Sequence, residues 1–247
     1  MQKLIYSLAN KIFMNEVESE LLHLSKKKNK IIFDVGCYRG FFTKNILSIE
    51  PLNNNNKYYL FDPNPKVKNY IKELTLNKNI NYFELALDNS NQIKKFTINK
   101  FFEPSGSSLK SSHKKDKLYN LSRRIFFQLF QPFSKIQNYE TIKVKTNTID
   151  KICELNNIKE IDILKLDTDG NEFEVLMGAK KLLSKGKIKL IYTEISGFKK
   201  NFQQKSNKLI NLLKKYNFTL IKVYPIKSFS FLSNLKSTDN LFIKKEY

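Results

Sequence analysis

The chain has 247 residues, of which 41% are hydrophobic, and this length suits one α/β domain spanning 1–247 with a full core. No apolar run approaches the ~20 residues needed to cross a bilayer, and the N-terminus has no signal-peptide cleavage pattern, so we expect a cytoplasmic protein. Cys37 and Cys153 are the only cysteines and lack a C-x-x-C spacing. That pattern argues against structural zinc and against a disulfide scaffold.

The formal net charge is +21, and a strongly basic chain can bind nucleic acid or an anionic membrane. Only three of the 44 basic residues are arginines, however: Arg39, Arg123 and Arg124. The chain is also rich in asparagine, isoleucine and phenylalanine, which A/T-rich codons supply, so codon composition can explain much of the charge. Proteins that read phosphates and bases rely on arginine forks, and we therefore expect no nucleic-acid partner.

The apolar periodicity predicts strands that alternate with helices. Helices are expected at 1–24, 39–49, 66–76, 150–155, from the turn at 168–171 through 183, and at 206–216. Strands are expected at 31–33, 57–61, 80–87, 161–167, 188–195, 218–224 and 240–245, with a hairpin-like pair at 93–98 and 141–146 around an insertion, 100–138. Such alternation indicates a mostly parallel sheet with helices on both faces. The chain then divides into an N-terminal helix segment (1–29), a core that carries the motifs (30–195), and a C-terminal helix with strands (196–247).

The clearest functional pattern is the stretch 31–42, I-I-F-D-V-G-C-Y-R-G-F-F. An apolar strand ends at Asp34, and Gly36 and Gly40 allow a sharp turn and the close approach of a ligand before a helix begins. Tyr38 stands where a dinucleotide-binding turn has its middle glycine, and the phosphate-binding pattern G-x-x-x-x-G-K-S/T is absent. An acid before the turn suits S-adenosylmethionine, which is positively charged and has no phosphate. An ordinary strand-turn-helix corner is the alternative interpretation.

Acids also follow the next two strands. Asp62 ends the second strand, where this kind of fold binds the ribose hydroxyls of its cofactor, although a helix cap before Pro63 is an alternative. Ala86 and its apolar neighbours end the third strand and could line an adenine slot. Asp88 could meet the exocyclic amine there, or it could be an ordinary acidic turn residue.

The richest stretch, K-L-D-T-D-G-N-E, begins at Lys165. A lysine inside an apolar strand is unfavourable unless it is paired, and Asp167 or Glu194 is the predicted partner. Asp167 leaves the sheet at its carboxyl edge, and Glu194 ends the fifth strand at the same crevice. Asp169 and Glu172 fall at the start of the next helix, where the dipole favours anions. The ligand spacing of a calcium loop is absent.

Over residues 30–195 the chain resembles the FkbM family of S-adenosylmethionine-dependent methyltransferases. The motifs that carry the resemblance are, in order, F-D-V-G-C-Y-R-G, F-D-P-N-P, L-A-L-D, S-G-S-S-L, T-I-D-K-I, I-L-K-L-D-T-D-G-N-E-F-E-V-L-M-G-A and Y-T-E-I. The family commonly has Glu at the positions of Asp62 and Asp169, so both carboxylates are kept with a shorter reach. The resemblance implies a seven-stranded Rossmann-like sheet with an antiparallel last strand. It also implies O-methylation, often of a sugar hydroxyl or a natural product.

We hypothesise that an acceptor oxygen attacks the methyl carbon in line, while the protein aligns the reactants and removes the hydroxyl proton. The candidate catalytic residues are Asp167, Lys165, Glu194 and His113. The candidate cofactor ligands are Asp34, Gly36, Tyr38, Gly40, Asp62, Ala86, Asp88 and Asp167. The candidate acceptor contacts are Asp169, Glu172, Ser107 and Ser108. No residue is assigned to a metal, although the acids could instead hold Mg²⁺.

Several alternatives stay open. The insertion 100–138 is interpreted as a lid on the acceptor side, or as carrying a basic, aromatic helix over 117–134 that rests on the inner membrane surface. The acceptor is expected to be a small molecule or glycan, with RNA 2′-O-methylation and a non-catalytic cofactor-binding module as competing functions. The sequence gives no indication of the oligomeric state.

Overall fold

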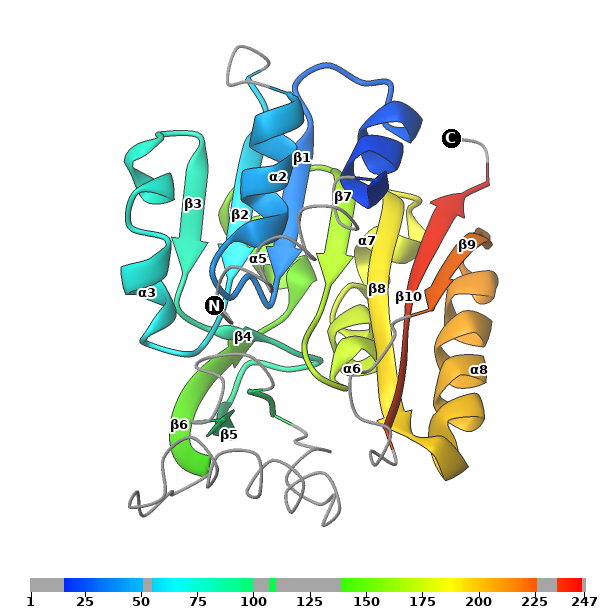
Figure 1. Ribbon diagram of the computed structural model, residues 1–247. Coiled ribbons are helices and arrows are strands. Elements are labelled where there is room, and N and C mark those ends of the chain that lie inside the picture. The colour runs from blue at the N-terminus through cyan, green and yellow to red at the C-terminus, as the bar shows by residue number, and fades with distance from the viewer. Residues whose placement is uncertain (1–15, 51–54, 100–106, 110–138, 226–234, 246–247) are drawn as a thin grey trace.

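The computed structural model describes residues 16–50, 55–99, 107–109, 139–225 and 235–245. Its centre is a seven-stranded sheet with the order β3-β2-β1-β7-β8-β10-β9 (Figure 1). The strands are β1 Ile31–Val35, β2 Lys57–Phe61, β3 Ile80–Phe83, β7 Ile161–Leu166, β8 Ile188–Phe198, β9 Phe218–Pro225 and β10 Leu235–Lys244. The pairs from β3 to β8 are parallel, and β10 is antiparallel to both of its neighbours. The predicted Rossmann-like fold with an antiparallel last strand is therefore confirmed.

Helices cover both faces of this sheet. Side chains alternate between the faces along each strand, so each face presents apolar side chains that the helices bury. In β1, Ile32 enters one core, while Phe33 and Val35 enter the other. The helix at 16–24 packs on the Ile32 side. It is joined there by α2 (Phe41–Ile49) and α3 (Val67–Tyr70). The opposite face is covered by α5 (Ile149–Leu155), α6 (Glu172–Met177), α7 (Lys180–Ser184) and α8 (Lys199–Lys215).

A second, three-stranded sheet has the order β4-β6-β5, with β4 Ala86–Leu87, β5 Ile93–Asn99 and β6 Tyr139–Asn147. The predicted pairing of 93–98 with 141–146 is confirmed as an antiparallel ladder. Phe96, Ile98 and Val144 form a small core on its inner face. Figure 1 shows this sheet beneath the carboxyl ends of β1, β2 and β7.

Three predicted elements are divided or shortened. The helix expected at 66–76 is a single turn, α3, followed by a 3-10 turn, Leu74–Leu76, because asparagine, tyrosine and threonine in this stretch are weak helix formers. The strand expected at 80–87 ends at Phe83, where the N–H of Leu85 turns back to bond the Phe83 carbonyl at 2.9 Å. The helix expected through 183 is broken at Gly178.

Other boundaries differ mainly at polar stretches. The helix expected at 206–216 begins at Lys199, and the last strand, expected from 240, begins at Leu235. Both early portions are polar and carry weak periodicity. The early part of β10 forms a strand because it pairs with β8. The helix expected over 1–24 is confirmed over 16–24, while 1–15 lie outside the described residues. Within the described part of the chain, no helix is both long and apolar enough to cross a membrane.

We predict that Gly178→Ala lowers the stability of the protein. An added Cβ at Gly178 would lie 2.1 Å from the backbone carbonyl oxygen of Asp88, so the backbone must shift, at about 1–3 kcal/mol of unfolding free energy. The matched control is Gly197→Ala, whose Cβ would first meet side-chain atoms of Lys205 at 3.0 Å, which can move aside. Urea unfolding measures both variants, and equal losses in the two would contradict the close approach described here.

Candidate functional site

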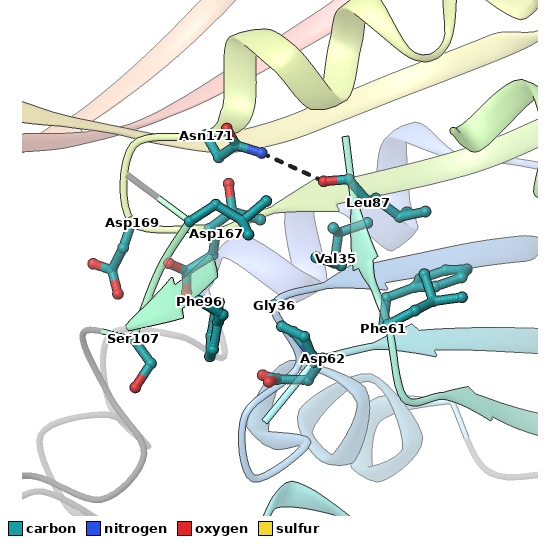
Figure 2. Close-up of a pocket in the computed structure, with 15 residues that line it drawn as sticks. Val35, Gly36, Phe61, Asp62, Leu87, Phe96, Ser107, Asp167, Asp169 and Asn171 are labelled. Carbon is teal, nitrogen blue, oxygen red and sulfur yellow. Dashed lines mark hydrogen bonds between the residues drawn. The ribbon is translucent and has the colours of Figure 1, made fainter. Parts of the chain in front are cut away.

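A cleft lies at the carboxyl edge of the main sheet, where the turns after β1, β2 and β7 meet the inner side of the small sheet. Its lining includes six of the predicted site residues: Gly36, Asp62, Ala86, Ser107, Asp167 and Asp169. Figure 2 shows Asp167 and Asp169 on one side and Gly36 with Asp62 on the other. The predicted crevice at this edge therefore brings together residues from distant parts of the chain.

The turn after β1 is packed tightly against the end of β7. Gly36 has φ +73°, and a Cβ there would lie 1.8 Å from the carbonyl oxygen of Asp167. The N–H groups of Gly36 and Cys37 both donate to the Phe61 carbonyl, at 2.8 and 3.1 Å. Only glycine fits this close, left-handed position, so the glycine sets how near the first turn comes to Asp167.

The buried side chain of Lys165, on β7, contacts this turn. The β1–β7 register places Lys165 opposite Asp34, and its ammonium lies 3.1 Å from Asp34 Oδ1 and 3.5 Å from Asp167 Oδ2. It also donates to the carbonyl oxygen of Gly36 at 2.8 Å. Burial alone would lower the pKa of Lys165, but the carboxylates of Asp34 and Asp167 outweigh burial and raise it above its usual range. Asp167 is thus a partner as predicted, whereas Asp34, not Glu194, is the other.

Asp34 does not lie on the cleft surface. Its side chain is fully buried, and its second oxygen accepts a hydrogen bond of 2.9 Å from Thr43 Oγ1 on α2. This placement puts Asp34, a predicted cofactor ligand, behind the cleft lining. The carboxylate instead holds Lys165 and α2, and so acts on the site through the turn that they position.

Backbone N–H groups of the turns after β1 and β2 hold the Asp62 carboxylate at the cleft. Its two carboxylate oxygens accept hydrogen bonds from the N–H groups of Tyr38, at 3.1 Å, and Asn64, at 3.0 Å. Burial raises the pKa of Asp62 to about 6, because it outweighs these two hydrogen bonds. Tyr38, a predicted cofactor ligand, contributes its backbone N–H here, with φ 50°. Gly40 precedes α2 and lies against Leu74, outside the cleft lining.

The loop after β7 is braced from within by Glu172. Its Oε1 accepts hydrogen bonds from the Thr168 N–H, the Thr168 hydroxyl and the Gly170 N–H, at 2.9, 2.9 and 3.0 Å. Glu172, a predicted acceptor contact, is buried, and its carboxylate shapes the loop. Ser108 is also buried and donates to the Asp169 carbonyl at 3.0 Å. Asp169 itself remains on the cleft surface.

Two acids from neighbouring strands, Glu194 and Asp239, gather beside Asp167. Glu194 on β8 faces Asp239 on β10 in the antiparallel register, and the Tyr192 hydroxyl donates to Asp239 Oδ2 at 2.8 Å. Burial and the nearby carboxylates of Asp167, Asp169 and Asp239 raise the pKa of Glu194 well above its usual value. Burial likewise raises the pKa of Asp239 to about 6.

Asp239 was not predicted. The last strand was expected to start one residue later, so its polar beginning carried no apolar signal. The sequence signal for Asp239 is an acid two residues before the apolar run that begins at Leu241. In an antiparallel last strand, such a residue arrives at the same edge as the carboxyl ends of the parallel strands.

Of the two residues predicted to lie near an adenine ring, Ala86 lines the cleft and Asp88 does not. Ala86 lines the cleft, next to Phe61, Phe96 and Leu109. Phe96 and Leu109 were missed, because they belong to the small sheet and the segment paired with it. Asp88 turns away, where it is buried and accepts hydrogen bonds from Lys94 and from the N–H of Asn89. The apolar wall can hold a flat ring.

Two further predictions are limited by what the structure describes. His113 lies outside the described residues. Among the residues that are described, no group of three or more His, Cys, Asp or Glu side chains is arranged to hold a metal ion.

Comparison with known proteins identifies the family. Residues 34–220 match the family described as the methyltransferase FkbM domain. The chain belongs to the FkbM family of S-adenosylmethionine-dependent methyltransferases. A curated relative, the 2-O-methyltransferase NoeI of Sinorhizobium fredii, is 25% identical over 189 residues, which cover 73% of this chain and 69% of the relative.

Solved structures resemble this FkbM-family chain in fold at low sequence identity. A methyltransferase FkbM from Methylobacillus flagellatus is 10% identical with a TM-score of 0.47, and the match covers 87% of this chain and 43% of that protein. The N-methyltransferase NodS of Bradyrhizobium japonicum is 10% identical with a TM-score of 0.45, covering 94% of this chain and 96% of that one. This chain therefore spans less than half of the length of the Methylobacillus protein.

We predict that Lys165→Met destabilises this FkbM methyltransferase by about 3–5 kcal/mol, because it leaves Asp34 as an uncompensated buried charge. It should also weaken cofactor binding, since the Gly36 carbonyl loses the ammonium that fixes the first turn. The matched control is Lys30→Met, because Lys30 is equally buried and pairs with Glu50 at 3.0 Å, before β1 begins at the far edge of the sheet.

Urea unfolding and calorimetric titration with S-adenosylmethionine measure the two effects. The double variant Asp34→Asn/Lys165→Met should recover much of the stability, because no unpaired charge is then buried. If Lys165→Met and Lys30→Met weaken cofactor binding equally, Lys165 has no specific part in shaping the turn.

Proposed function

We propose that this FkbM-family protein transfers the methyl group of S-adenosylmethionine to a hydroxyl oxygen of a sugar, a glycan or a related natural product. The observation that carries the proposal is the cleft itself. One carboxylate suited to ribose, Asp62, shares it with an apolar wall and with Asp167, whose side chain is 47% exposed. A cofactor bound between them has its reactive end near an accessible acid.

The cofactor arrangement follows from the two sides of the cleft. Asp62 accepts hydrogen bonds from the two ribose hydroxyls, since each of its oxygens keeps a lone pair beyond its backbone partner. The ring packs against the wall of Phe61, Ala86 and Phe96. The methionine end then extends along the Gly36 turn, where no side chain blocks its approach.

For the acceptor, the name of the relative NoeI records methylation of a 2-hydroxyl oxygen, and this supports oxygen as the nucleophile. Asp167 is the proposed acceptor of the hydroxyl proton, because it is the most accessible acid beside the turn. Its carboxylate also lies near the buried acid Glu194 and helps to raise the pKa of that residue. Asp169 and Ser107, on the same cleft, are proposed to orient the acceptor.

A lid formed by 100–138, His113 as the base, and membrane contact through 117–134 concern segments that are largely outside the described residues. The cytoplasmic location is consistent with two free, buried cysteines, Cys37 and Cys153. The RNA alternative loses part of its basis, since Lys165 is buried and directed at Asp34 and Gly36.

We predict that cofactor affinity falls as the pH drops through about 6. The pKa of Asp62 is raised to about 6, and only its ionised form can accept two ribose hydroxyl protons, so protonation removes a hydrogen-bond acceptor. Affinity should be steady above this pH and decline below it. Asp62→Asn should bind roughly 10–100-fold more weakly at pH 7.5, since a hydrogen bond to a charged group contributes about 1.5–3 kcal/mol.

Calorimetric titration from pH 5 to pH 8 checks both statements. The control is Asp88→Asn, which removes a buried carboxylate charge outside the cleft and should keep the pH dependence. If the cofactor affinity of Asp62→Asn declined equally as the pH falls, a group other than Asp62 would control the pH dependence.

We predict that Asp167→Asn lowers the rate of methyl transfer by roughly 10²–10⁴-fold, the usual contribution of a positioned base. Cofactor affinity should change much less, because the ribose contact is on the other side of the cleft. Formation of S-adenosylhomocysteine, and a gain of one methylene in acceptor mass, are measured with a panel of sugars and oligosaccharides, with RNA as the competing acceptor.

Asp169→Asn is the matched control, since it removes an equal charge from the same loop and should mainly raise KM for the acceptor. Repeating the assay with EDTA separates acid-base chemistry from metal assistance. Turnover on RNA and on no carbohydrate would replace the proposed acceptor class, while cofactor binding would be unaffected by that result.

A further inference from the structure

The outer face of the small sheet concentrates positive charge. In the β5–β6 ladder, Lys95 is directly paired with Lys143, and Ile93 with Lys145. Residues paired in this way project from the same face, and all four of these are exposed. The face therefore presents three lysines and one isoleucine, and we call it the lysine face.

This arrangement is unfavourable for an isolated sheet. Like charges placed directly opposite each other destabilise an antiparallel pair. None of the carboxylates in the described residues forms an ion pair with Lys95, Lys143 or Lys145. By contrast Lys94, on the inner face, is paired with Asp88. The lysines of the lysine face thus have no carboxylate partner comparable to the one that Lys94 has on the inner face of β5.

Ile93 adds an apolar contact to this charge. Its side chain is 70% exposed, although it is paired with Lys145 in a regular strand. An exposed isoleucine beside lysines fits a surface that offers anionic groups above hydrocarbon. A nucleic acid is the poorer match, because its readers rely on arginine forks and stacked aromatics, which Ile93 and the three lysines do not supply.

We propose that the lysine face docks the protein on an anionic phospholipid surface, with Lys95, Lys143 and Lys145 at the headgroups and Ile93 entering the interface. Lysines near such a surface bind it through charge and are screened by salt. The inner side of the same sheet carries Phe96 and lines the cleft, so docking brings the cleft within about one sheet spacing, ~10 Å, of the lipid. The surface is defined by charge and shape alone, and does not depend on which acceptor is methylated.

The test is sedimentation of the full chain with vesicles made of equal parts phosphatidylcholine and phosphatidylserine, compared with phosphatidylcholine alone. Binding should require phosphatidylserine and weaken as salt is raised. The triple variant Lys95→Glu/Lys143→Glu/Lys145→Glu should partition roughly a hundredfold less, as expected for three lysines near an anionic surface. Ile93→Ser should lower binding several-fold with no change in charge.

The matched control reverses three exposed lysines elsewhere, Lys180, Lys185 and Lys215, and has the same net charge as the first triple variant. It should keep most of the vesicle binding. An equal loss in both triple variants would overturn the proposal, because net charge and not the lysine face would then control binding. Absence of vesicle binding by the unaltered protein would overturn it too. The proposal would also be overturned if the lysine-face triple variant lost binding to a single-stranded RNA but kept its binding to vesicles. Unchanged calorimetric binding of S-adenosylmethionine checks that each variant is folded.

Discussion

The contact between Lys165 and its two acids is the interaction on which the site depends. An ammonium group is strongly disfavoured inside a sheet, and every residue of β7 is buried. The group is accommodated because Asp34, Asp167 and the Gly36 carbonyl surround it. The Lys165 side chain therefore fixes the position of the turn after β1 relative to the ends of β1 and β7. Thr43 extends the same network to α2 through the second oxygen of Asp34.

Charge is distributed unevenly over this basic protein. The carboxyl edge of the main sheet gathers Asp167, Glu194 and Asp239, and burial raises the pKa of the latter two. The excess of lysine lies elsewhere, on surfaces such as the outer side of the small sheet. The net charge of +21 therefore says little about the site.

The small sheet links these two regions. Its inner side adds Phe96 to the cleft, and its outer side presents the lysine face. Family membership establishes methyl transfer, and the proposed cofactor cleft lies at the carboxyl edge of the seven-stranded sheet.

The sequence by itself determined the order of strands and helices, the glycine turn after β1, and the acids at Asp62 and Asp167, because period-two apolar runs and glycines act locally. It also indicated the crevice and the cofactor class. Only the tertiary structure decided which acid pairs with Lys165, that Glu172 turns inward to brace its loop, and that Asp239 joins the acidic edge. Those outcomes depend on the register between strands that are far apart in the chain. A local pattern does not encode that register, since many pairings would bury the same apolar side chains.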